Sequence, residues 1–193
     1  MMYSIELMKE EHQNIRRMIA VLSRMDIAVM NGAPVDVDTY RKIIGFIRNY
    51  SDAHHHGKEE KFLFPVMTEE LGKIAENLIT HGMLVEHDLG RGHVLALEQA
   101  LRAFEKDPSD ENKLDILTES MAWGHLLASH THKEDTVVYP FAERSLPLND
   151  RNRIDEACRA YEEEPEHASV RERWLSFLAD MEKKVGLLEE AAV

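Results

Sequence analysis

The sequence predicts an all-α protein, an up-down-up-down four-helix bundle with additional C-terminal helices. Three observations predict this fold class. The 193 residues include only nine Gly and six Pro, so long stretches contain no residue that breaks a helix. Apolar residues recur at intervals of three and four, the period of one helix face. Short links join the segments with this pattern, which makes consecutive helices antiparallel neighbours.

The first two helices form one predicted hairpin. Apolar side chains between Ile5 and Leu22 repeat with the helical period, and the first helix should end near Asn31-Gly32, where glycine favours termination. A second helix should start between Asp36 and Asp38. Pro65 is expected to mark its end or a kink, because proline removes a helical hydrogen bond.

Two further helices form the second hairpin. One is expected from Leu71 or Ile74 to Glu105, and the next from Asp110 to Tyr139-Pro140. We therefore predict one bundle domain over residues 1–146.

Residues 147–193 are predicted to be a C-terminal helical extension. Its amphipathic pieces, residues 151–162 and 166–188, should pack on the bundle, on a protein partner or on a second copy of the chain. No group of residues within the extension suggests chemistry.

Charge and composition exclude several partners. The formal net charge of −13 would repel nucleic acid and phosphate-rich membrane surfaces. No run of about 18 apolar residues is present to span a membrane, and the N-terminal segment lacks the apolar core of a signal peptide. Cys158 is the only cysteine, so the chain forms no internal disulfide. We expect a cytoplasmic protein that binds neither nucleic acid nor membrane.

A repeat of 75 residues sorts the eleven histidines. Glu11-His12 with Arg16 matches Glu86-His87 with Arg91 at this offset. Later positions match in the same way: His55, Lys58, Glu59, Glu60 and Pro65 correspond to His130, Lys133, Glu134, Asp135 and Pro140. The two hairpins therefore look like copies of one another. Four histidines recur in both copies: His12, His55, His87 and His130.

The recurring residues should meet at one level of the bundle. At about 1.5 Å per residue, the four histidines lie at similar distances from the turns of their hairpins. Glu59 and Glu134 each follow a recurring histidine by four residues, which places them on the same helix face. We predict six metal ligands: His12, His55, Glu59, His87, His130 and Glu134.

The ligand types point to iron. Burying four imidazoles and two carboxylates without a cation would be costly, and a metal removes that cost. Two histidines and one carboxylate from each hairpin suit iron with open positions, and two carboxylates can bridge a pair of ions. A single structural zinc would leave two ligands unused. We expect two non-haem iron ions, although another divalent metal could take their place.

Other polar residues compete with this set. Glu60 and Asp135 also recur, but the four-residue spacing favours Glu59 and Glu134. Arg16 and Arg91 are expected either to pair with Glu11 and Glu86 or to orient a ligand carboxylate.

The remaining histidines have lesser expected roles. His56 and His132 should be solvated or neighbour the site, and His125 is the strongest outside candidate for a ligand. Four others are expected on the surface: His54, His81, His93 and His167.

The motifs resemble the bacterial hemerythrin-like (HHE cation-binding) family. The resemblance covers residues 4–146 and rests on Glu11-His12, on residues 55–60 with 63–65, on Glu86-His87 with Gly90-Arg91, and on residues 130–135 with Tyr139-Pro140. It implies a four-helix bundle with a carboxylate-bridged di-iron centre. Oxygen-carrying hemerythrins have two histidines four residues apart on the third helix, whereas Met83 and Arg91 flank His87 at that spacing. This difference counts against reversible oxygen carriage.

The leading functional hypothesis is a di-iron protein that binds or senses a small diatomic ligand, oxygen or nitric oxide, or iron itself. The alternatives are a di-iron enzyme that consumes peroxide or oxygen, and a structural metal-binding interaction module. The sequence does not separate the sensor from the enzyme.

Overall fold

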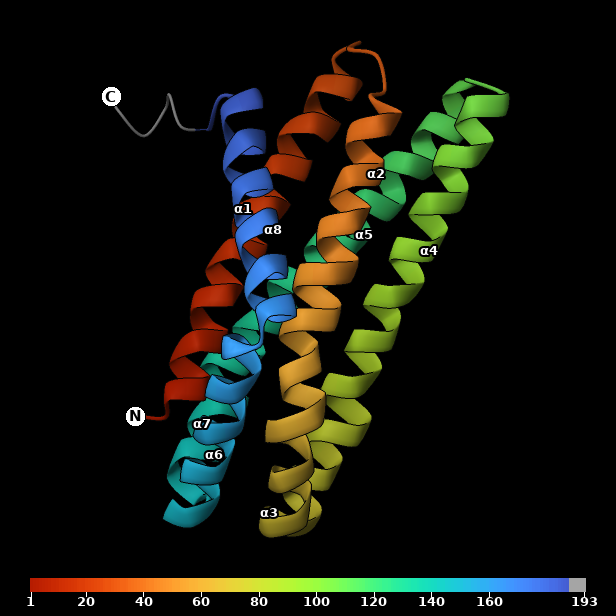
Figure 1. Cartoon of the computed structure of the whole chain (residues 1–193). Helices are drawn as coiled ribbons and strands as arrows, with labels where there is room; N and C mark the ends of the chain where they lie inside the picture. The colour runs from red at the N-terminus through yellow and green to blue at the C-terminus, as the bar shows by residue number, and fades with distance from the viewer. Residues whose placement is uncertain (188–193) are drawn as a thin grey trace.

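The computed structural model describes residues 1–187 and confirms the predicted fold class (Figure 1). Long antiparallel helices form a bundle, and two more helices follow at the C-terminus. The first long helix is α1 (Tyr3–Met30). The second contains α2 (Val37–Phe46), the π-helical segments η1 (Ile47–His56) and η2 (Glu59–Leu63), and the part of α3 (Phe64–Leu78) before a break at Gly72.

The second hairpin and the extension complete the order of elements. The third long helix contains the part of α3 after Gly72, η3 (Ile79–Met83) and α4 (Leu84–Lys106). The fourth contains α5 (Asp110–Lys133), η4 (Glu134–Val138) and α6 (Tyr139–Ser145). The extension consists of α7 (Leu148–Glu163) and α8 (Pro165–Lys184). The predicted boundary between residues 146 and 147 therefore falls in the link between α6 and α7, and residue 188, the predicted end of the last piece, lies outside the described residues.

The second long helix does not end at Pro65. Pro65 lies at the start of α3, directly after the π-helical η2, and Leu63 and Phe64 keep helical φ and ψ across this junction. The helical path breaks instead at Gly72, whose φ of 65° is readily adopted only by glycine. The fourth long helix similarly continues past Pro140 to Ser145.

The irregular winding follows the sequence repeat. The π-helical segments η2 (59–63) and η4 (134–138) are related by the same offset of 75 residues. Each begins at a predicted ligand, Glu59 or Glu134. π-Helical turns are rare and often mark functional sites. Their recurrence at the same offset is structural evidence for the duplication seen in the sequence.

Two apolar clusters leave a polar layer between them. One contains Ile15, Leu22, Tyr40 and Trp123, and the other contains Ile5 and neighbours such as Leu63, Phe64 and Val138. Along every long helix, the predicted ligands lie between residues of one cluster and residues of the other. The clusters therefore shield the layer from water at both ends.

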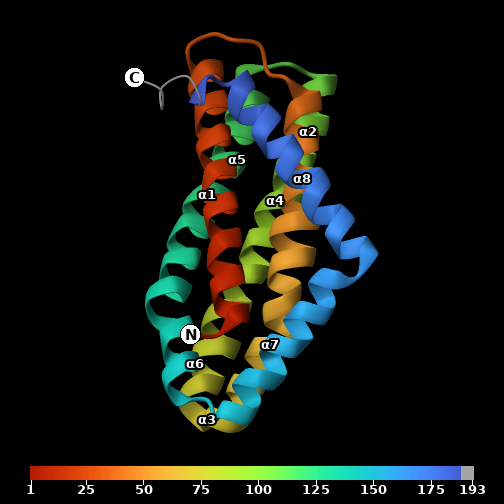
Figure 2. The same ribbon diagram turned by 60° about the vertical axis from the view of Figure 1, so that its left-hand side comes forward.

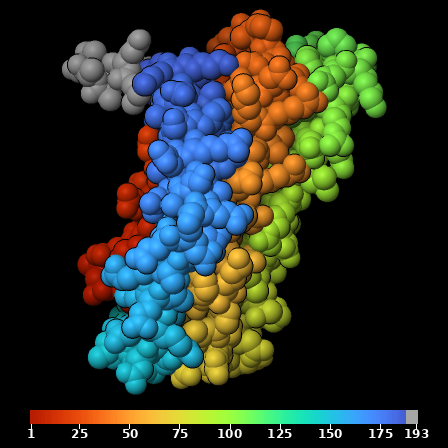
Figure 3. All heavy atoms as spheres, in the orientation of Figure 1, coloured from red at the N-terminus to blue at the C-terminus, as the bar shows by residue number. Residues whose placement is uncertain are grey.

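The C-terminal helices cover one side of this bundle. Figures 2 and 3 show α7 and α8 lying across α1 and the second long helix, and in Figure 3 the green α4 remains uncovered. Trp174 of α8 packs against Phe46, and a Cβ atom at Gly45 would lie only 2.7 Å from the Trp174 ring. Trp174 and Leu178 belong to the first apolar cluster, and Cys158 of α7 belongs to the second. Among residues 1–187, no helix has the length and apolar character needed to cross a bilayer.

The Cys158 thiol should be unreactive in the folded protein. Its side chain is fully buried, and burial raises the pKa of the thiol to about 12. Because the thiolate is the reactive species, we expect Ellman's reagent to label Cys158 at pH 8 only as the protein unfolds in denaturant. Complete labelling of the native protein with an unchanged helical circular dichroism signal would contradict the packing of α7.

Candidate metal centre

The six predicted ligands meet in the polar layer. They come from all four long helices, and each side chain is at most 1% exposed. Glu134 Oε2 lies 3.2 Å from both His12 Nε2 and His130 Nε2. Glu59 Oε2 lies 3.5 Å from His87 Nε2 and 3.9 Å from His55 Nε2. Each carboxylate thus lies near one imidazole from its own helix and one from the other hairpin, and the repeat relates the two arrangements.

Two overlapping groups of donor atoms could each hold an ion. In each group, the donor atoms lie within 4.8 Å of one another. One group contains His12, His55, Glu59 and Glu134, and the other contains His56, Glu59, His87 and His130. Glu59 belongs to both groups, so its carboxylate can bridge neighbouring ions.

A carboxylate holds the outer nitrogen of each recurring histidine. The Nδ1 atoms donate to acidic oxygens at 2.7–2.9 Å in four pairs: His12–Asp135, His55–Glu11, His87–Glu60 and His130–Glu86. Such a contact fixes the tautomer and directs the Nε2 lone pair inward. The hydrogen bond from His87 lowers the pKa of Glu60 to about 2, and the bond from His130 lowers that of Glu86 to about 2.

Basic side chains hold these outer carboxylates in turn. Four pairs follow the repeat: Arg16–Asp135, Arg91–Glu60, Lys58–Glu11 and Lys133–Glu86. Arg16 and Arg91 therefore bind Asp135 and Glu60, not the Glu11 and Glu86 considered from the sequence. The outer carboxylates are consequently anionic acceptors, suited to orient the histidines.

The atoms that face inward lack partners. Within the described residues, hydrogen-bond partners are missing for Nε2 of His55, His56, His87 and His130, for Oε2 of Glu59 and for both carboxylate oxygens of Glu134. Burial and the neighbouring Glu59 raise the pKa of Glu134 well above its ordinary value. Buried polar atoms are rarely left unsatisfied. The donors at the centre therefore have the arrangement and the chemistry that a metal requires.

His56 lies at this centre, although the sequence pattern had assigned it a solvated or neighbouring position. It is 5% exposed, and its ring stacks on that of His87 with centroids 3.7 Å apart. Burial lowers its pKa well below the ordinary value, so the ring is neutral and can donate to a metal. The π-helical winding of η1 changes the direction of successive side chains relative to an α-helix. The buried donors gathered at the centre therefore include a fifth histidine.

Tyr139 is a further polar residue at the centre that the pattern of ligands did not single out. Its hydroxyl donates to Glu59 Oε1 at 2.6 Å and lies 3.3 Å from His12 Nε2. The equivalent residue in the first hairpin is Phe64, whose ring lies beside His87. In the sequence, the only sign of this difference is that the repeat has a phenylalanine at position 64 and a tyrosine at position 139. The centre is thus symmetric in its recurring histidines and glutamates and asymmetric in His56 and Tyr139.

The other histidines lie away from the centre. His81, His125 and His132 are exposed, and His93 is half-buried against Glu119.

His54 corrects the expectation of a surface position. It is 1% exposed, with Nε2 3.0 Å from Glu162 and 3.3 Å from Glu11. Its environment is formed by the C-terminal extension, since Glu162 belongs to α7. The fully buried Lys58 donates to both Glu11 and Glu162. Its ammonium group therefore provides a cation between these acids. The extension thus contributes to the polar network, contrary to the sequence-based interpretation.

Comparison with known families gives one match that bears on this centre. A family model described as the hemerythrin HHE cation binding domain matches residues 3–142. A comparison with curated proteins found no match. The matched range includes every residue of the centre, while α7 and α8 lie beyond it.

Proposed function

Because the chain belongs to the hemerythrin family of HHE cation-binding domains, we propose that its buried centre holds two non-haem iron ions. The unpartnered donors that face inward carry this proposal. The six ligands predicted from the sequence are retained, and His56 is added as a seventh. Glu59 and Glu134 are preferred to Glu60 and Asp135, because the latter two are already bonded to histidine Nδ1 atoms.

The donor set supports iron. It combines imidazole nitrogens and carboxylate oxygens without a thiolate, as in non-haem iron sites. Iron bound there would supply reversible electron transfer and affinity for oxygen species. The chain itself holds each imidazole in one orientation, excludes bulk water with its two apolar clusters and places the Tyr139 hydroxyl proton beside Glu59.

We infer that the protein binds or senses a small diatomic ligand, oxygen or nitric oxide, or responds to iron itself. A di-iron enzyme that consumes peroxide or oxygen is the second candidate. The Tyr139 hydroxyl favours this alternative, since a buried proton donor beside the ligands can serve a reaction that consumes protons. A structural metal-binding interaction module is the third, and for it the extension would provide the partner surface.

The metal content should be close to two ions per chain, mainly iron in protein from iron-supplied cells. Elemental analysis combined with a protein assay measures the number of metal ions per chain. His55→Ala and His56→Ala should both lower it, whereas His132→Ala, which changes an exposed histidine on the same helix as His130, should leave it unchanged. A reproducible ratio near one in the unmodified protein would refute the paired centre.

Tyr139→Phe separates the sensor from the enzyme. The change gives the second hairpin the phenylalanine that the first already has at position 64, so iron content should be retained. If the protein is an enzyme, turnover of peroxide should fall by about 10²-fold or more, the lower range for loss of a positioned proton donor. Equal turnover in both forms would show that the reaction does not use the Tyr139 proton. Absence of turnover in both forms, together with stoichiometric ligand binding, would favour the sensor. Peroxide consumption can be followed by titrating the peroxide that remains.

A further inference from the structure

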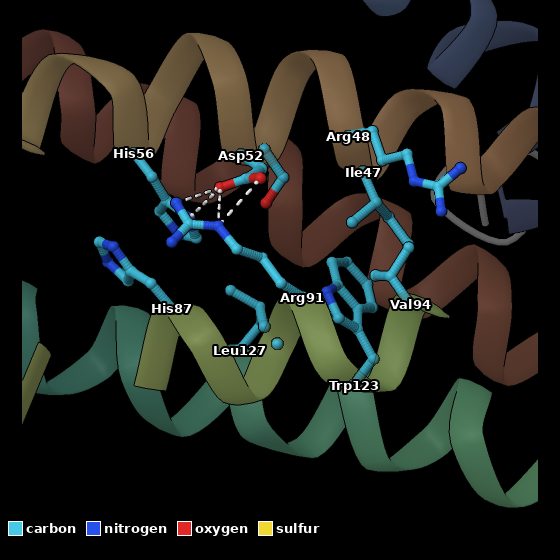
Figure 4. A pocket seen from close by; sticks show the side chains of 11 residues that line it. Ile47, Arg48, Asp52, His56, His87, Arg91, Val94, Trp123 and Leu127 are labelled. Atoms are coloured by element: carbon cyan, nitrogen blue, oxygen red, sulfur yellow. Dashed lines mark hydrogen bonds and ion pairs between the residues drawn. The ribbon is translucent and has the colours of Figure 1, made fainter. Parts of the chain in front are cut away.

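A small cavity adjoins one side of the metal centre. It has a volume of about 90 Å³ and lies between the second long helix and α4, above residues of α5. His56 and His87 line one end, and Ile47, Val94, Trp123 and Leu127 form an apolar part (Figure 4). Arg48, Ser51, Asp52, Gly90 and Arg91 complete the lining. A molecule in this cavity would therefore touch two imidazoles of the centre.

The apolar part of the cavity is suited to an uncharged occupant. Ile47, Val94, Trp123 and Leu127 are each no more than 4% exposed, so these walls belong to the protein interior. Interior cavities with apolar walls stay dry and accept small apolar species such as xenon.

The charged groups at the cavity are already paired. Arg91 donates to Asp52 and Glu60 at 2.8 and 2.7 Å, and Arg48 donates to Glu98 at 2.9 Å. Because these cations have acidic partners, they hold no free charge for an anion. In Figure 4, the bonds between Arg91 and Asp52 lie between the imidazoles and the apolar residues.

The repeat explains why the cavity exists on this side. Its position on α4 is occupied by Gly90, whereas the equivalent residue on α1 is Ile15, which is fully buried. A Cβ atom at Gly90 would lie 3.4 Å from Leu127 Cδ2. The second hairpin therefore leaves space where the first has a large side chain.

We propose that this cavity is a holding site through which a small uncharged gas molecule, of the dioxygen or nitric oxide class, reaches the His56 and His87 side of the metal centre. The inference deepens the proposed function and rests on it. The ion pair between Arg91 and Asp52 lies between the apolar part of the cavity and the two imidazoles, and the gas molecule would pass it.

Xenon tests the holding site without relying on iron reactivity. Crystals of the metal-loaded protein under xenon pressure should show one xenon atom beside Val94 and Trp123. Val94→Phe should remove it by filling the space, while Leu95→Phe, on the neighbouring residue that is 52% exposed, should retain it. An empty cavity in the unmodified protein under xenon would overturn the inference.

The rate of nitric oxide binding tests the route. In reduced, iron-loaded protein, stopped-flow mixing should give a rate constant several-fold lower for Val94→Phe than for the unmodified protein or Leu95→Phe. Gly90→Ala is the second variant, since alanine favours the helix and keeps the fold while narrowing the cavity. Its rate should also fall, with an unchanged or higher melting temperature.

Xenon binding and the nitric oxide rate together distinguish failure of this inference from failure of the proposed function. Xenon binding combined with unchanged nitric oxide rates in both variants would overturn the route. Xenon in the cavity of an iron-loaded protein that does not bind nitric oxide would support the holding site and contradict the proposed diatomic ligand.

Discussion

Glu134→Gln is expected to stabilise the metal-free protein and to weaken the metal-loaded one. In the metal-free protein, both Glu134 oxygens are buried without partners and face Glu59. The substitution removes this charge and should stabilise the fold by up to about 3 kcal/mol at neutral pH, the lower range for an uncompensated buried charge. With metal present it removes a ligand, and affinity should fall by more than the roughly 10–100-fold lost when an outer partner of a ligand is changed.

The pH dependence has a definite sign. The pKa of Glu134 in the folded protein is raised above its ordinary value of 4.5, so the folded state binds its proton more tightly than the unfolded state does. Relative to the glutamine variant, the unmodified metal-free protein therefore loses stability as pH rises above about 4.5 towards the raised pKa. Denaturant unfolding at pH 5 and pH 8, with and without chelator, measures this difference.

Glu60→Gln is the matched control for this experiment. Glu60 carries a pKa lowered to about 2 by the hydrogen bond from His87, so its charge stabilises the fold at neutral pH and that stability is lost as pH falls towards 2. The control should destabilise the metal-free protein at pH 8. Destabilisation by both substitutions in chelator would show that Glu134 has a partner in solution.

Lys58→Met should destabilise the protein far more than Lys133→Met. The two lysines are equivalent in the repeat, and each binds the acid that holds a histidine. Lys58 is fully buried between Glu11 and Glu162, whereas the Lys133 side chain is 45% exposed. Removing the buried ammonium group that these two acids share should cost about 3–5 kcal/mol. The exposed pair should contribute about 1 kcal/mol or less.

A compensating variant keeps this prediction specific. Adding Glu162→Gln to Lys58→Met removes one of the two acids that lost the ammonium group and should recover part of the lost free energy of unfolding, measured by urea denaturation. Equal losses for the two single lysine variants would show that α7 does not bury Lys58 in solution.

The repeat made the bundle and much of the centre predictable. Since each recurring histidine has a counterpart 75 residues away, the sequence alone grouped His12, His55, His87 and His130 and excluded the exposed His125 and His132 from that group. The helical spacing also placed Glu59 and Glu134 beside them. Those inferences depend on local periodicity and symmetry, which a sequence displays directly.

The asymmetric residues could not be predicted in the same way. His56 has Thr131 as its counterpart, and its inward direction follows from π-helical winding that apolar periodicity does not report. His54 and Lys58 are buried by Glu162 and its neighbours on α7, more than 100 positions later. The packing of the extension against one side of a symmetric bundle is a tertiary choice that the repeat itself does not contain.

The pattern of outer contacts has an evolutionary consequence. Glu11 and Glu86 hold histidines of their own hairpins, His55 and His130, whereas Glu60 and Asp135 hold histidines of the opposite hairpin. A single hairpin would therefore lack half of these contacts, but two identical hairpins associated about a twofold axis would supply them all. An ancestral gene encoding one hairpin could form the whole set as a homodimer. Fusion of two copies would then free each half to diverge, allowing His56, Tyr139 and Gly90 to arise on one side only.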